Sequence, residues 1–288
     1  QKRVAQVAAD GKELALFSLK LFEDVVLANS NYLNLITSDA YTHRTYYMGL
    51  VDDNNHVNFY SGMIRVVSPE GEEFGRFPVQ DYLKQLSEHV EPWSYVKFPF
   101  LKSVGWNGFT DGKKSGIYSV APLARLNAAE GMATERAQEY YQKYFEMLGG
   151  KPVHFTLANH WARLIEMLYA AERMVELAAD PEITSKQTRA IPDAIPKEGM
   201  GVVEAPRGTL FHHYQTDERG VIQKANLIVA TQNNAGRMAM SVDKAARSLI
   251  RDGQVDDGIL NKIEMAFRAY DPCLACATHT AGRMPLTV

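Results

Sequence analysis

Two cysteines and a histidine near the C-terminus have the types and spacing of metal ligands. Cys273 and Cys276 are the only cysteines of the chain, and His279 lies three positions after the second. Thiolates at positions i and i+3 of a turn point to the same side, so both sulfurs can reach one soft metal ion. The dipeptide Asp271-Pro272 should end the preceding helix. The spacing therefore predicts a metal site.

Other interpretations fit the same spacing. A closed zinc site normally takes four cysteine or histidine ligands, and His279 would bring this group to three at most. A redox-active pair of the thioredoxin kind also has two cysteines separated by two residues, and two cysteines can lie near each other without any joint role. These alternatives stay open on the spacing alone.

A second candidate is Arg207, which stands between Pro206 and Gly208. Proline constrains the backbone on one side, and glycine leaves it free to turn on the other. A guanidinium held in this way presents several fixed donors and keeps its charge, which suits a small anion or a polar diatomic ligand. An ion pair between Arg207 and Glu204 across the turn is an equally good interpretation of the motif.

Composition limits the class of protein. The 288 residues are 46% hydrophobic and 23% charged, with a formal charge of −3, which is typical of a globular chain. The chain has no run of Lys and Arg residues, so neither a nucleic acid nor an anionic membrane is predicted as a partner. No apolar run reaches the roughly 18 residues of a membrane span, and no apolar signal core follows Gln1, so we expect a cytoplasmic protein.

Helical spacing of apolar residues predicts the scaffold that positions these candidates. A core helix is expected over about 12–28, a helix over 134–148 with Thr134 as its N-cap, and a long central helix over 155–179. Two further helices, at about 241–252 and 257–270, lead into the cysteine pair. His154 and His160 are expected to be packed or surface histidines rather than ligands.

Strand-like alternation appears in two places. A small antiparallel meander is predicted over about 56–79. A turn and strand over 199–214, a hairpin turn over 216–220 and a return strand over 225–230 follow a polar connection. The aromatic residues of 93–106 are expected to pack an irregular loop onto the body rather than to bind a ligand. The predicted fold class is α+β, predominantly helical, with long packed helices and small antiparallel hairpins.

Together the motifs resemble a known family. The C-terminal stretch 271–279, preceded by Glu264-Met265-Ala266-Phe267-Arg268-Ala269-Tyr270, resembles the C-terminal signature of the large, catalytic subunit of nickel–iron hydrogenases. The stretch 204–214 looks like that family's second active-site motif, and the similarity extends to 122–127 and 160–166. Residues 1–288 are then the C-terminal part of a large-subunit domain, with its active-site motifs over 199–279. Within this family, the residues after Arg207 and those before Asp271 are most similar to the cytoplasmic, cofactor-linked group.

The resemblance implies roles for the metal ligands. Cys273 would be a terminal nickel thiolate, and Cys276 would bridge nickel and iron in a nickel–iron centre whose iron carries cyanide and carbonyl ligands. His279 would be a ligand to a nearby magnesium and the last residue of the mature protein. Hydrogen would be split heterolytically at the metals, with electrons leaving through iron–sulfur clusters on a partner.

The resemblance also implies a pocket around the iron ligands. Arg207 would lie above the open metal position and contact a cyanide, and Asp271 would pair with Arg207 and fix its direction. Thr231 would donate to the second cyanide, next to Ala230, where many relatives have a proline. Pro206 and Leu210 would shape the rest of the pocket.

The same resemblance implies partner proteins. They are an iron–sulfur small subunit, an electron-acceptor module and a maturation protease. The acceptor module would be a heterodisulfide reductase or a reductase of NAD(P) or deazaflavin, and the heterodisulfide-reductase branch is the nearest. No nucleic acid and no membrane span are expected.

Two departures from the family pattern qualify this prediction. The family site needs four cysteines, and the other Cys-x-x-Cys belongs to an N-terminal part that 1–288 lack. The chain would be one half of a subunit whose N-terminal half is separate, or a remnant without metal. The residues 280–288 would be a cleavable extension of an unprocessed precursor. A metal-free scaffold like the relative in respiratory complex I, or a zinc or disulfide clip, are the alternatives.

Overall fold

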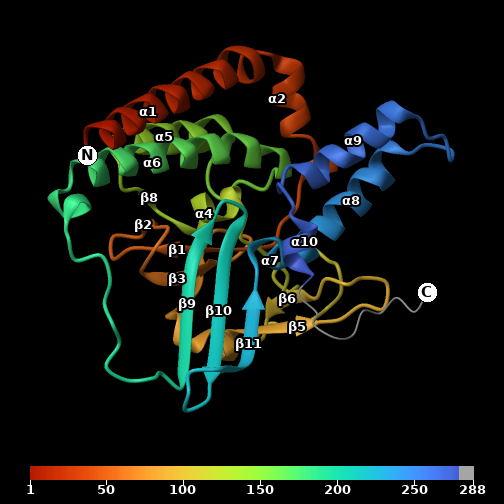
Figure 1. The fold of residues 1–288 in the computed structure, drawn as a ribbon. Coiled ribbons are helices and arrows are strands. Elements are labelled where there is room, and N and C mark those ends of the chain that lie inside the picture. The colour runs from red at the N-terminus through yellow and green to blue at the C-terminus, as the bar shows by residue number, and fades with distance from the viewer. Residues whose placement is uncertain (279–288) are drawn as a thin grey trace.

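A six-stranded mixed sheet forms the centre of the computed structural model, which describes residues 1–278 (Figure 1). Its strands run in the order β4-β3-β1-β2-β8, and β7 also pairs with β1. Every residue of β1 is buried, because β1 pairs with β2, β3 and β7 and is covered on its faces. The strands are β1 (Tyr46–Val51), β2 (His56–Val57), β3 (Met63–Val67), β4 (Glu73–Phe77), β7 (Tyr118–Ser119) and β8 (Gly131–Met132).

A layer of long helices lies across one side of this sheet, at the top of Figure 1. The helix α1 (Lys2–Phe22) continues into a π-helical turn, Glu23–Leu27, and packs beside α6 (Asn159–Ala179). The helix α5 (Glu135–Met147) packs on α6 as well. Their apolar faces contribute to the largest core cluster of the described residues, which includes Trp161, Leu19, Tyr144, Ile165 and Leu168. Burial of these faces is the main stabilisation of the layer.

A three-stranded antiparallel sheet stands in front of the central one, drawn in cyan in Figure 1. It consists of β9 (Glu198–Ala205), β10 (Gly208–Thr216) and β11 (Ile222–Ile228). The turn between β9 and β10 points toward the helical layer. The three-stranded sheet is joined to the segment between β2 and β3, where the Glu204 N–H donates to the Phe59 carbonyl at 2.9 Å.

The remaining elements are short strands and helices on either side of this turn in the sequence. Short elements precede it in the chain: α2 (Ser30–Ile36), α3 (Tyr82–Gln85), β5 (Leu86–His89), β6 (Phe98–Leu101) and α4 (Pro122–Ala128). The last four helices follow it: α7 (Ala230–Asn233), α8 (Ala235–Leu249), α9 (Asp257–Arg268) and α10 (Leu274–Ala277). None of the helices within residues 1–278 is long and apolar enough to cross a bilayer.

The α+β prediction is confirmed, while several boundaries differ. The first helix begins at Lys2 instead of near residue 12, and α8 begins at Ala235 instead of 241. The return strand ends at Ile228, and Ala230 opens α7. The meander prediction missed β1, because a strand buried on both faces shows no alternation of polar and apolar residues.

Aromatic residues between β5 and β7 pack onto the body as predicted, but the stretch is not wholly irregular, because β6 pairs with β5. Phe98 contacts both Trp93 and Phe109, and it belongs to a core cluster with Met238 and Tyr270. Through this cluster, the segment between β5 and β7 is attached to α8 and to the end of α9 rather than forming a separate unit.

The two histidines of the central helix region are packed or exposed, as predicted. His154 is buried against Tyr47, whereas His160 is exposed.

Candidate active site

The turn between β9 and β10 carries Arg207 and depends on the glycine that follows it. Gly208 has a φ of 135°, in the region that disfavours side chains. A Cβ atom at this position would lie 2.5 Å from the Val120 carbonyl oxygen. Glycine thus lets the turn lie directly against the segment before α4.

Arg207 is held by Asp271 from the end of α9. Its Nε donates to the Asp271 carbonyl at 2.5 Å and lies 3.3 Å from Oδ2 of the same residue. Asp271 has a φ of 51°, so the chain reverses here after the helix and turns its carbonyl toward the arginine. The Arg207 side chain remains 36% exposed. The alternative pairing of Arg207 with Glu204 is wrong, because Glu204 is bound to Arg125.

The two cysteines lie at the start of α10, directly after the chain reversal at Asp271. Their Cα atoms are 5.3 Å apart and their sulfurs are joined in a disulfide. Cys273 is partly buried and Cys276 is exposed. The Cys273 N–H donates to Thr231 Oγ1 at 3.1 Å, which leaves the threonine hydroxyl hydrogen available to another acceptor. The structure thus brings Cys273 together with Thr231, 42 residues away in the sequence.

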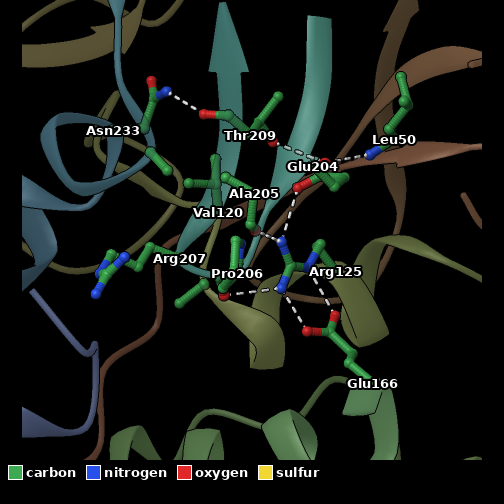
Figure 2. A network of polar contacts seen from close by, with 12 residues as sticks. Leu50, Val120, Arg125, Glu166, Glu204, Ala205, Pro206, Arg207, Thr209 and Asn233 are labelled. Carbon is green, nitrogen blue, oxygen red and sulfur yellow. Dashed lines mark hydrogen bonds and ion pairs between the residues drawn. The ribbon is translucent and has the colours of Figure 1, made fainter. Parts of the chain in front are cut away.

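Behind the turn lies a buried cluster of one arginine and two glutamates (Figure 2). Arg125 on α4 contacts Glu166 on α6 with Nε and Nη2, the Nε distance being 2.6 Å. Its Nη1 donates to Glu204 at 3.0 Å. The other Glu204 oxygen accepts from the Leu50 N–H and the Thr209 hydroxyl. Figure 2 shows Arg207 extending from the turn on the side away from Arg125.

Comparison with known proteins assigns this arrangement to a family. The family model described as nickel-dependent hydrogenase matches residues 52–279, which include the turn, Asp271 and both cysteines. The chain belongs to the nickel-dependent hydrogenase family. Membership implies a nickel–iron centre in the complete enzyme.

Individual relatives agree with the family. The chain is 47% identical over its whole length to an iron-sulfur subunit of the F420-non-reducing hydrogenase of Archaeoglobus profundus, covering 60% of that protein. It is 43% identical over 84% of its length to the beta subunit of the NAD-reducing hydrogenase HoxS of Cupriavidus necator, covering 49% of that protein. The chain therefore spans at most about three fifths of these relatives.

Solved structures of the family share the fold. An NAD+-reducing [NiFe]-hydrogenase in the H2-reduced state superposes with a TM-score of 0.86 at 34% identity, over 96% of this chain and 58% of that one. A [NiFeSe]-hydrogenase from Dm. baculatum superposes with a TM-score of 0.65 at 20% identity, over 97% of this chain and 60% of that one. The second match supports the fold alone.

The residues present fit part of a nickel site. When reduced, Cys273 and Cys276 provide two adjacent soft thiolates at an accessible edge of the fold, as nickel requires. Within residues 1–278 no three His, Cys, Asp or Glu side chains are grouped for a metal ion. His279 and the extension 280–288 lie outside the described residues. The described chain thus contains two cysteines that can serve as soft metal ligands once they are reduced.

The other residues named from the sequence lie around the turn. Pro206 is exposed beside Arg207, and Leu210 is partly buried two residues into β10. Ala230 and Thr231 are buried in the first turn of α7. Apart from His279, the structure gathers every predicted site residue near one edge of the β9–β10 hairpin.

Sequence reasoning missed the buried cluster and Asn234. Arg125 had appeared only as part of a family motif, although it is the single charge in the apolar stretch 122–129. Glu166 likewise follows buried residues of an amphipathic helix. A charged residue at an expected core position is a signal for a paired, buried ion. Its partner cannot be read from the sequence, because Arg125 and Glu204 are 79 residues apart.

Burial and pairing act in opposite directions on the ionisation of this cluster. Burial raises the pKa of Glu204 to about 7, although Arg125, the Leu50 N–H and the Thr209 hydroxyl stabilise its charged form. Burial disfavours the charge of Arg125, but Glu166 and Glu204 outweigh that effect and keep its pKa above the usual value. The arginine stays charged, and Glu204 changes its protonation near neutral pH.

This shift predicts a pH dependence of folding. Since the pKa of Glu204 is raised from 4.5 to about 7, the folded state binds the proton more tightly than the unfolded state. Its contribution is fully present below pH 4.5 and is lost as the pH rises through about 7, by an amount on the order of 3 kcal/mol at most. Urea unfolding across this range should show a smaller loss in Glu204→Gln than in the wild type. Parallel curves for the two proteins would contradict the assignment.

Proposed function

We propose that this chain is part of the catalytic subunit of a nickel–iron hydrogenase, which oxidises hydrogen reversibly to protons and electrons. The observation that carries the proposal is the contact of Arg207 with Asp271, two residues before Cys273. This contact brings a partly exposed guanidinium close to the distant segment that carries the two cysteines. An arginine and a thiol pair meeting in this way serve a metal site better than they serve packing.

Cys273 and Cys276 are the thiolates that hold the metals. Cys273 would be a ligand of nickel, and Cys276 would be a thiolate ligand shared by nickel and iron. Two further thiolates come from a Cys-x-x-Cys segment that the 288 residues do not contain. When bound, the nickel–iron centre supplies the redox-active metals at which hydrogen is split heterolytically. His279 would bind magnesium and would be the residue after which the maturation protease cuts.

Arg207, Asp271 and Thr231 arrange donors around the diatomic ligands of iron. Among residues 1–278, the contacts of the Arg207 side chain involve Nε alone, so its Nη hydrogens remain for a cyanide. Asp271 fixes the direction of the guanidinium through its carbonyl and carboxylate. The Thr231 hydroxyl accepts from Cys273 and keeps its hydrogen for the second cyanide. Pro206, Leu210 and Ala230 line the remaining pocket.

Partners are inferred from the relatives and from the resemblance. Electrons leave through iron–sulfur clusters of a small subunit to an acceptor module. The similarity to an F420-non-reducing and to an NAD-reducing hydrogenase supports an acceptor other than a deazaflavin, such as heterodisulfide reductase or NAD. Both acceptor systems are consistent with a cytoplasmic enzyme.

Metal analysis of the complex purified with its natural partners tests the proposal. We expect nickel, with iron in excess of nickel because the iron–sulfur clusters of the partner also contain iron, together with infrared bands from iron-bound cyanide and carbonyl. Zinc alone would support a zinc clip, and no metal with an intact disulfide would support a disulfide clip. A complex that is active without nickel, or a metal-free complex containing the missing Cys-x-x-Cys, would overturn the proposal in favour of a metal-free scaffold.

A further inference from the structure

We infer that Arg125 and Asn234 are positioning residues that together fix the backbone of the Arg207 turn. The inference rests on the proposed function for the role of Arg207, while the clamp itself stands on the contacts below. Neither residue reaches the guanidinium of Arg207. Each acts on the main-chain carbonyls from which that side chain projects.

Arg125 uses all five of its N–H donors. Its Nε and one Nη2 hydrogen bind the two oxygens of Glu166, and one Nη1 hydrogen binds Glu204. The other Nη1 hydrogen goes to the Ala205 carbonyl at 2.5 Å, and the other Nη2 hydrogen goes to the Pro206 carbonyl at 3.1 Å (Figure 2). The two glutamates orient the planar guanidinium, so that its remaining donors meet two successive carbonyls of the turn.

Asn234 holds the next carbonyl of the turn. Its Nδ2 donates to the Arg207 carbonyl at 2.9 Å and to the Ala230 carbonyl at 3.2 Å. Its Oδ1 accepts from the Ser119 hydroxyl and from the N–H groups of Val120 and Ala121, at distances of 2.9 to 3.1 Å. Asn234 is 1% exposed, and its side chain joins three separate segments of backbone.

The three carbonyls of residues 205, 206 and 207 are therefore each bound by a buried side chain. Asn234 also ties this turn to the start of α7, where Thr231 accepts from the Cys273 N–H. Asn234 therefore helps to fix the position of the Arg207 backbone relative to the Cys273 backbone. Displacement of a positioned group by about 1 Å can cost about a hundredfold in rate, so fixing these two backbones matters for function.

An isosteric variant separates positioning from packing. Asn234→Asp keeps the acceptor oxygen for Ser119, Val120 and Ala121 but places a carboxylate oxygen against the carbonyls of Arg207 and Ala230. The matched control is Ser119→Ala, which removes one contact on the acceptor side of the same asparagine and leaves both of its donors. We expect hydrogen turnover per bound nickel to fall about tenfold or more in Asn234→Asp, and to stay near wild type in the control.

Two further readouts do not depend on turnover. In Asn234→Asp the infrared bands of iron-bound cyanide should shift, and hydrogen–deuterium exchange should increase in the segment 204–210. Arg125→Lys should have the same effects, because an ammonium keeps the charge but has three donors instead of five. If Asn234→Asp fails to fold, Arg125→Lys tests the inference in its place.

The outcomes decide between the alternatives. If a variant loses activity only in proportion to its nickel content, with unchanged rate per nickel and unchanged cyanide bands, the residues stabilise the core and the inference fails. If exchange of 204–210 is unchanged in both variants, no clamp exists and the inference also fails. A wild-type complex without nickel would refute the proposed function separately, and the exchange experiment would then decide the clamp by itself.

Discussion

Replacing Cys273 with serine is expected to remove nickel from the complex and to abolish hydrogen uptake. A serine hydroxyl is a hard donor that stays protonated at neutral pH, so it cannot replace a soft thiolate that stabilises nickel through its redox changes. Nickel per complex and hydrogen-dependent dye reduction should both fall to background. Cys276→Ser should behave in the same way, because both sulfurs lie at the same edge of the fold.

A neighbouring substitution provides the control. Ala275→Ser adds a hydroxyl between the two cysteines at an exposed position and keeps both sulfurs. It should retain nickel and activity. Undiminished hydrogen uptake in Cys273→Ser would refute the ligand assignment. If the pair is instead a structural disulfide, reduction with dithiothreitol should destabilise the protein, whereas ligand thiols require reduction before metal loading.

Replacing Arg125 with methionine is expected to destabilise the protein by about 3–5 kcal/mol, the usual cost of removing one partner from a buried ion pair. Arg125 and the carboxylate groups of Glu166 and Glu204 are almost fully buried. Methionine fills much of the arginine volume but leaves both carboxylates without a cation and the Ala205 and Pro206 carbonyls without donors. Urea unfolding of the complex, followed by a signal from this chain, measures the change.

Arg65→Met is the matched control. Arg65 also binds two carboxylates and one carbonyl, those of Glu73, Glu130 and Ala128. Its carboxylate partners are 40% and 51% exposed, so water can solvate them once the arginine is gone. We expect a loss of roughly 1 kcal/mol for this variant. Equal losses at Arg65 and Arg125 would show that burial of the partners does not determine the cost.

Local features of the site could be predicted from residue order alone. The i, i+3 spacing places both cysteines on one turn, and Asp271-Pro272 ends the helix before them. Pro206 and Gly208 predict a turn at Arg207, and the structure has it between β9 and β10. These features depend on backbone preferences of a few neighbouring residues, so they can be read from residue types in order.

Most contacts between distant residues became known only from the folded chain. Residue types alone allowed Arg207 to pair with Glu204, three residues away, whereas the family resemblance implied Asp271. Arg207 binds Asp271, and Glu204 binds Arg125, which nothing in the sequence indicated. The contacts of Asn234 were likewise not predictable, because its partners lie far away in the chain. The β1 strand was missed for another reason, since it is buried on both faces and shows no alternation of polar and apolar residues. A buried charge or amide must find a partner wherever the fold provides one, since leaving it unpaired costs more than any local preference supplies. Burial, which arises only when the chain is folded, therefore selects these contacts.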